Sequence, residues 1–281
     1  MGLHRERLGW WMLGLLGCGL TRSASAMFTP ALLFTTLLWA SQPGQARRAL
    51  RWGGAGLLAV AGSVGAVAFF QWLQVGEPFA FVKAQKFWGR GLQWPQLPFF
   101  TPSGINMLWL DALGLWLGAA SITTGLWLGV RWLKRRQHPL PNVPPVVLFA
   151  LGYCISIALF IVLYQAGSIW NFSRYLFATP FFVVLVWHLN AQPAWPRHYY
   201  FYLLLATLVL WQTFGAFTLE FDNFTWGQAL WYFGLLSAYL FAYLMLRQLR
   251  WQREITMVLY MFNLVMQLHL LECFLQGYVV Q

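Results

Sequence analysis

Long uncharged apolar segments alternate with short basic clusters along the whole chain. Uninterrupted apolar runs of more than about 18 residues are typical of helices that cross the hydrocarbon core of a bilayer. These runs lack the alternation of barrel strands, and in lipid only helices and closed barrels satisfy every backbone amide. The pattern predicts the following spans, the first two of them short: Leu8–Leu20, Ser25–Ala40, Gly53–Leu73, Met107–Val130, Pro145–Gln165, Tyr175–Leu189, Tyr199–Thr218, Gln228–Leu246 and Ile255–Leu271.

The expected fold class is therefore all-α. We predict a polytopic helical membrane protein with about seven to nine transmembrane or half-membrane helices. These helices would form a single integral membrane domain over residues 1–281. The start resembles a signal peptide, but Arg22 stands directly before its small residues and another apolar segment follows. We interpret it as a first membrane element rather than a cleaved leader.

Basic clusters between the spans predict the orientation of the chain. Loops rich in Lys and Arg face the cytoplasm under the positive-inside rule. With the predicted spans, four basic loops fall on one side, which we expect to be cytoplasmic. Their residues are Arg47, Arg48 and Arg51; Arg131, Lys134, Arg135 and Arg136; Arg197; and Arg247, Arg250 and Arg253.

Composition supports a membrane protein and argues against a nucleic-acid partner. Hydrophobic residues make up 59% and charged residues 9% of the chain, whereas a soluble domain carries about 25% charge. The formal net charge of +11 comes from Lys and Arg in short clusters between apolar runs, where they act as topology signals. The three cysteines lie in apolar segments without metal-ligand spacing. We predict membrane lipids as partners, no nucleic acid, no metal and no certain cofactor.

A second set of cations falls on the predicted external or luminal side. The external loop, about residues 76–106, contains an amphipathic segment from Glu77 to Arg90. Lys83, Lys86 and Arg90 follow i, i+3, i+7 spacing, so a helix would place their charges on one face. Arg22 and Arg174 fall on the same side of the membrane.

Two interpretations of these cations stay open. They contact the headgroups of anionic lipids and nothing more, as basic interfacial helices commonly do. Alternatively, Arg22, Lys83, Lys86, Arg90 and Arg174 converge on one phosphate-bearing substrate, because guanidinium and ammonium groups donate charge-assisted hydrogen bonds to phosphate. A lipid-linked sugar phosphate would bring such a group to this depth.

Three motifs resemble those of PIG-V-like mannosyltransferases. The stretch Gly76-Glu-Pro-Phe-Ala-Phe-Val-Lys-Ala-Gln-Lys-Phe-Trp-Gly-Arg90 resembles the external-loop helix of that family. Upstream, Gly19-Leu-Thr-Arg22 resembles its Leu-Thr-Arg element, and downstream Ser168-Ile-Trp-Asn-Phe-Ser-Arg-Tyr-Leu-Phe-Ala-Thr-Pro180 resembles its Arg-Tyr element. The motifs occur in the family's order and span about 160 residues. The first is fairly specific, whereas the other two are weak alone.

The resemblance implies a GT-C class membrane glycosyltransferase. Such enzymes take a polyprenyl-phosphate-linked sugar as donor substrate on the external or luminal face of a bacterial plasma membrane or an ER membrane, and their inverting transfer uses a carboxylate to activate the acceptor hydroxyl. The candidate substrate-binding residues are those matched by the motifs, together with Lys86 on the shared basic face: Arg22, Lys83, Gln85, Lys86, Arg90, Arg174 and Tyr175.

One departure leaves catalysis open. The family usually carries its essential acidic residue in the first external loop, and none of the seven acidic residues here lies in a long early loop. We interpret the chain as lacking the N-terminal catalytic part, either as a C-terminal portion, through a late start, or as a non-catalytic relative. The alternative function is therefore a non-catalytic membrane subunit or a lipid-phosphate-binding module, acting with a partner membrane subunit.

Asp111 is the weak catalytic candidate. It is the only carboxylate well inside a predicted span, near its external end. Ionisable residues within the membrane are functional candidates by default. Equally, an Asp that packs against an arginine or a backbone amide would be structural, so both interpretations stay open.

Overall fold

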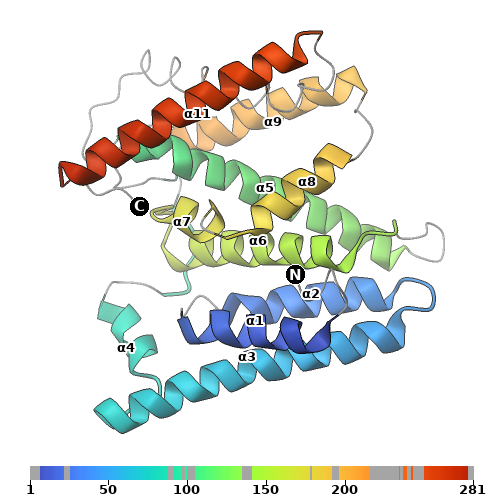
Figure 1. The fold of residues 1–281 in the computed structure, drawn as a ribbon, viewed down its shortest axis with the longest axis vertical. Coiled ribbons are helices and arrows are strands. Elements are labelled where there is room, and N and C mark those ends of the chain that lie inside the picture. The colour runs from blue at the N-terminus through green and yellow to red at the C-terminus, as the bar shows by residue number, and fades with distance from the viewer. Residues whose placement is uncertain are drawn as a thin grey trace. The chain divides into compact units, whose positions relative to one another are not determined.

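The computed structural model is helical throughout most of the residues that it describes (Figure 1). Those residues are 7–21, 26–87, 91–96, 99, 105–134, 141–177, 179–191, 196–215, 234, 237–238, 242 and 250–277. The helices are α1 (Leu8–Thr21), α2 (Phe28–Ala40), α3 (Ala46–Val75), α4 (Ala80–Phe87), α5 (Ile105–Leu133), α6 (Pro145–Tyr164), α7 (Phe172–Phe177), α8 (Phe181–Ala191), α9 (Arg197–Gly215) and α11 (Gln252–Leu275). The all-α class is confirmed.

Four of these helices are long and apolar enough to cross a membrane: α3, α5 over Leu110–Leu133, α6 and α11. Each coincides with a predicted span. The helices α1 and α2 are shorter, at 14 and 13 residues. At a rise of 1.5 Å per residue they reach about 20 Å, less than the ~30 Å hydrocarbon core, as expected for the two short segments. The full count of seven to nine stays a prediction, and most of Gln228–Leu246 lies outside the described residues.

The predicted span Tyr175–Leu189 is wrong as a single helix. Helix α7 ends at Phe177 and α8 begins at Phe181, with Pro180 between them. Proline has no backbone N–H to donate and its ring displaces the preceding residue from helical geometry. The composition of the predicted span hides the break, because Tyr175–Leu189 contains no Asp, Glu, Lys or Arg on either side of Pro180.

The chain divides into two compact units, and each is described by itself. Unit 1 comprises Met1–Gln93, Leu117–Ala166 and Leu176–Leu189. Unit 2 comprises Trp94–Trp116, Gly167–Tyr175 and Asn190–Gln281. The single membrane domain over residues 1–281 stays a prediction.

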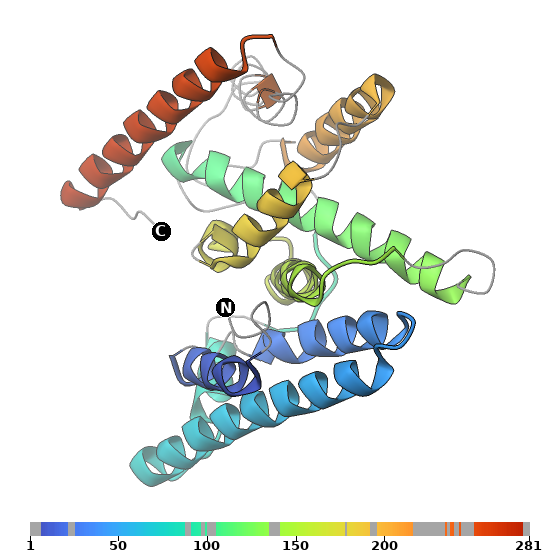
Figure 2. The same cartoon turned by 45° about the vertical axis from the view of Figure 1, so that its right-hand side comes forward.

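Helix α6 forms the core of unit 1. The helix is apolar on all sides, and 67% of its membrane-length stretch is buried. Such burial is expected for a helix without a polar face. It packs on α2. Helix α3 packs on both α1 and α2 and runs alongside them in both views (Figures 1 and 2). Glycines permit the close approach: the backbone of Gly152 faces Ala31, and Gly53 faces Thr36 with no room for a Cβ atom.

Two hydrogen bonds bring three helix ends together in unit 1. Gln42, in the turn between α2 and α3, donates from Nε2 to the carbonyl oxygen of Val143, just before α6, at 3.1 Å. Trp132, near the end of α5, donates from Nε1 to Ser41 Oγ at 2.7 Å. The basic clusters that begin at Arg47 and Arg131 therefore flank one end of this unit. The side of a membrane that this end faces stays a prediction.

The contact between Trp132 and Ser41 yields a modest testable effect. Interhelical hydrogen bonds in membrane proteins contribute about 0.6 kcal/mol on average. We expect a coupling of that size between Trp132→Phe and Ser41→Ala in a double-mutant cycle, measured as the free energy of unfolding in detergent. Trp127→Phe, which keeps the aromatic face beneath Arg131, is the control and should show no coupling to Ser41→Ala. Additive losses for Trp132 and Ser41 would contradict the bond.

Candidate functional site

Helix α4 carries the first motif and belongs to unit 1. Helix α3 stops at Gly76, which adopts a left-handed φ of 75° and donates its N–H to the Trp72 carbonyl oxygen at 2.9 Å. Helix α4 then starts at Ala80, and the Phe81 N–H points to Gln71 Oε1 of α3 at 3.5 Å. A helix is present where the loop helix was predicted, and it begins at Ala80 rather than at Glu77.

Lys83 projects from α4 with 67% of its side chain exposed. Its Nζ lies 2.6 Å from Glu77 Oε1, so Glu77 pairs with Lys83 from before the helix instead of occupying its first turn. An exposed pair of this kind adds little stability, and the ammonium group stays accessible to a further anion. Gln85 and Lys86 lie in α4, but their side chains are outside the described set, as are Arg22 and Arg90 altogether.

The loop after α4 covers the end of α6. Gly91 donates its N–H to the Tyr164 carbonyl oxygen at 3.3 Å, and Gln93 donates to Leu163 at 2.9 Å. These bonds satisfy two of the carbonyls that a helix leaves open at its C-terminus. Helix α6 has 20 residues, about 30 Å at 1.5 Å per residue. The loop therefore lies about one hydrocarbon thickness from the end of α6 that Gln42 contacts.

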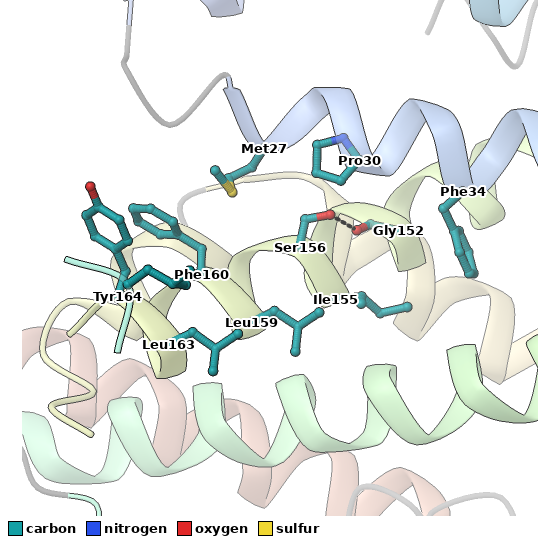
Figure 3. A pocket seen from close by; sticks show the side chains of 11 residues that line it. Met27, Pro30, Phe34, Gly152, Ile155, Ser156, Leu159, Phe160, Leu163 and Tyr164 are labelled. Atoms are coloured by element: carbon teal, nitrogen blue, oxygen red, sulfur yellow. Dashed lines mark hydrogen bonds between the residues drawn. The ribbon is translucent and has the colours of Figure 1, made fainter. Parts of the chain in front are cut away.

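An apolar groove lies between α2 and α6, next to this loop (Figure 3). Its volume is about 410 Å³. The lining residues are Met27, Pro30 and Phe34; Leu92 of the loop; and Gly152, Ile155, Ser156, Leu159, Phe160, Leu163 and Tyr164 of α6. We did not predict this groove. The sequence signal for it is the small pair Gly152 and Ser156, one turn apart on α6.

Asp111 forms the second feature, in unit 2. Its side chain is only 1% exposed. Its Oδ1 accepts hydrogen bonds from the Ser173 hydroxyl at 3.0 Å and the Ser173 backbone N–H at 3.3 Å. One turn along α5, Gly114 leaves room for Phe172, whose Cγ would lie 3.3 Å from an added Cβ atom. The carboxylate thus anchors the first turn of α7. Contact with a backbone amide was one of the two roles that the sequence left open for Asp111.

The turn that leads into α7 has an unusual backbone. Ala166 and Asn171 have φ angles of 56° and 68°, and Gly167 has a φ of 96°. Left-handed conformations are costly for residues with a Cβ atom and persist where the surrounding structure enforces them. Asn171 Oδ1 is also buried and has no hydrogen-bond partner in the described structure. The Ser168–Pro180 motif is therefore held in a strained, anchored conformation rather than in a continuous helix.

The anchored helix α7 carries the remaining two predicted residues. Arg174 is exposed, and Tyr175 is partly buried. Ser173, which the sequence analysis did not single out, is buried and joins Arg174 to the carboxylate of Asp111 through the backbone. Its place inside the third motif was the one signal that could have identified it. The assignment of these residues to a substrate stays a prediction.

Over the described residues, no group of three or more His, Cys, Asp or Glu side chains is placed to hold a metal ion. No protein-family model, curated protein or solved structure matches the chain. A function for the chain is therefore inferred from its own residues.

Proposed function

We propose that the chain is a GT-C-type membrane glycosyltransferase that transfers mannose from a polyprenyl-phosphate-linked donor. The transfer would occur on the external or luminal face of a bacterial plasma membrane or an ER membrane, with the basic loops in the cytoplasm. Support comes from the order of the three motifs and from the exposed cations, Lys83 and Arg174, that two of them carry.

The observation that carries this proposal is the anchoring of α7. The Asp111 carboxylate binds the residue directly before Arg174, through both its backbone and its hydroxyl. An arginine that projects from an anchored backbone loses less conformational entropy when it binds an anion. Its guanidinium group donates paired, charge-assisted hydrogen bonds that fit a phosphate.

The proposed reaction inverts the anomeric carbon of the sugar. The acceptor hydroxyl oxygen attacks that carbon, and the bond from the carbon to the phosphate oxygen breaks. The polyprenyl phosphate leaves with the electron pair, while the hydroxyl proton passes to a general base. Arg174 would stabilise the negative charge that develops on the leaving phosphate. The base is not assigned to Asp111, because its buried Oδ1 is already bonded to Ser173.

The same property of Asp111 favours the alternative function. A carboxylate that is 1% exposed and anchors a helix serves structure, and no other carboxylate was predicted within a span. A lipid-phosphate-binding module or non-catalytic subunit would keep the basic residues without needing a base. Such a module binds the donor without cleaving it.

Donor binding tests the basic residues. The purified full chain in vesicles should bind polyprenyl-phosphate-mannose, and Lys83→Ala or Arg174→Ala should each weaken binding roughly ten- to a hundredfold, because a hydrogen bond to a charged group contributes about 1.5–3 kcal/mol. Lys134→Ala and Arg253→Ala remove exposed cations of the predicted cytoplasmic loops and are the matched controls. Equal affinity of all four variants and the unaltered chain would overturn the proposal.

Sugar transfer by the purified chain separates the two functions. Transfer of mannose to an acceptor would support the enzyme if Arg174→Ala abolishes it and Arg253→Ala does not. Donor binding without any transfer would favour the binding module.

A further inference from the structure

The groove of unit 1 has the dimensions of one short hydrocarbon chain. It follows α6 from Gly152 to Tyr164, twelve residue steps, or about 18 Å at 1.5 Å per residue. Its volume of about 410 Å³ holds roughly fourteen groups the size of a water molecule, at ~30 Å³ each. A methylene group is of similar size. The groove is therefore long and narrow, as a single extended chain requires.

The lining of the groove suits hydrocarbon rather than water. Its side chains are uncharged, and Figure 3 shows the Ser156 hydroxyl donating to the Gly152 carbonyl oxygen instead of pointing to a ligand. A bound water needs two to four polar partners, which this wall does not offer. Leu159 is 43% and Leu92 80% exposed, so the groove is open along one side. A chain could enter sideways from a bilayer.

One end of the groove lies at the loop that follows the basic helix α4. Leu92 lines the groove, and its neighbours Gly91 and Gln93 are hydrogen-bonded to the end of α6. The segment from residue 76 to residue 96 contains three cations, Lys83, Lys86 and Arg90, and one acid, Glu77, giving a net charge of +2. Tyr164 lines this same end. The charge favours an anionic headgroup above an apolar chain.

We infer that this groove binds one acyl chain of an anionic glycerophospholipid whose headgroup lies at the loop after α4. The length selects an acyl chain, because a polyprenyl chain extends far beyond the ~18 Å of groove that α6 lines. This lipid is distinct from the sugar donor, so the inference does not rest on the proposed function. It gives the external cations a second anionic partner, in unit 1.

Photolabelling of the full chain tests the inference. The chain is reconstituted in phosphatidylcholine vesicles with a trace of phosphatidylglycerol that carries a diazirine on its acyl chain. Label should map to α6 between Gly152 and Tyr164 and to the start of α2. Unlabelled phosphatidylglycerol should reduce this label at least about fivefold more effectively than phosphatidylcholine, since each basic residue near a headgroup contributes ~1 kcal/mol.

Two variants locate the site. Leu159→Trp fills the groove and should remove most of the label from α6. Leu33→Trp places the same side chain at an exposed position of α2 outside the lining (54% exposed) and should leave the label unchanged. Equal competition by phosphatidylcholine, stronger competition by polyprenyl phosphate, or label only outside α2 and α6 would each overturn the inference. The competition experiments use the unaltered chain, so they decide the matter even if Leu159→Trp fails to fold.

Discussion

Gly167→Ala is expected to destabilise unit 2 by about 3 kcal/mol, combining left-handed backbone strain with overpacking. Gly167 has a φ of 96°, and a Cβ atom there would collide with the backbone carbonyl oxygen of Gln96. The added Cβ atom would meet only backbone atoms of Gln96, so no side-chain rotation relieves the collision. The free energy of unfolding in mixed detergent micelles measures the loss.

Gly44→Ala is the matched control for Gly167→Ala. Gly44 has a similar left-handed φ of 73° but nothing within 4 Å of an added Cβ atom. It therefore reports backbone strain alone, at about 1–2 kcal/mol. If both alanines cost the same, the contact between Gly167 and Gln96 contributes nothing, and the close packing of this turn would be refuted.

Asp111→Ala is expected to destabilise unit 2 by a similar amount, about 2–4 kcal/mol. The substitution leaves the Ser173 hydroxyl and backbone N–H buried without their acceptor, and each unsatisfied group costs about 1–3 kcal/mol. Ser173→Ala should cost less, because the backbone bond to Asp111 survives. Asp111→Asn should also cost less than Asp111→Ala, since an amide oxygen can accept the same two bonds.

A double-mutant cycle of Asp111→Ala with Ser173→Ala measures their interaction directly. We expect a clearly non-additive result, and additive losses would show that the carboxylate does not hold α7. Asp111→Asn also separates structure from chemistry. A folded Asn variant that keeps donor binding and transfer would assign Asp111 to positioning, whereas loss of transfer with intact folding and binding would assign it to the reaction.

The helical membrane class could be predicted because its cause is local. Exclusion of water from the hydrocarbon core demands uncharged runs of a minimum length, and that requirement is visible in any stretch such as Pro145–Tyr164. The α4 segment was predictable for the same reason, since amphipathic spacing is a short-range property. The interruption at Pro180 was visible as a residue, but apolar composition on both sides concealed its consequence.

The sequence by itself determined the helical class, four long apolar helices and the short basic helix α4, since each follows from hydrophobicity and spacing within one segment. Only the tertiary structure decided that Asp111 anchors Ser173, 62 residues away. It also decided that α2, α6 and Leu92 line one groove. These features depend on how side chains from distant segments pack, and a linear pattern of apolar residues is compatible with many such packings. Hydrophobicity hardly distinguishes one apolar side chain from another in lipid. The shapes of the side chains therefore decide which helices pack against each other.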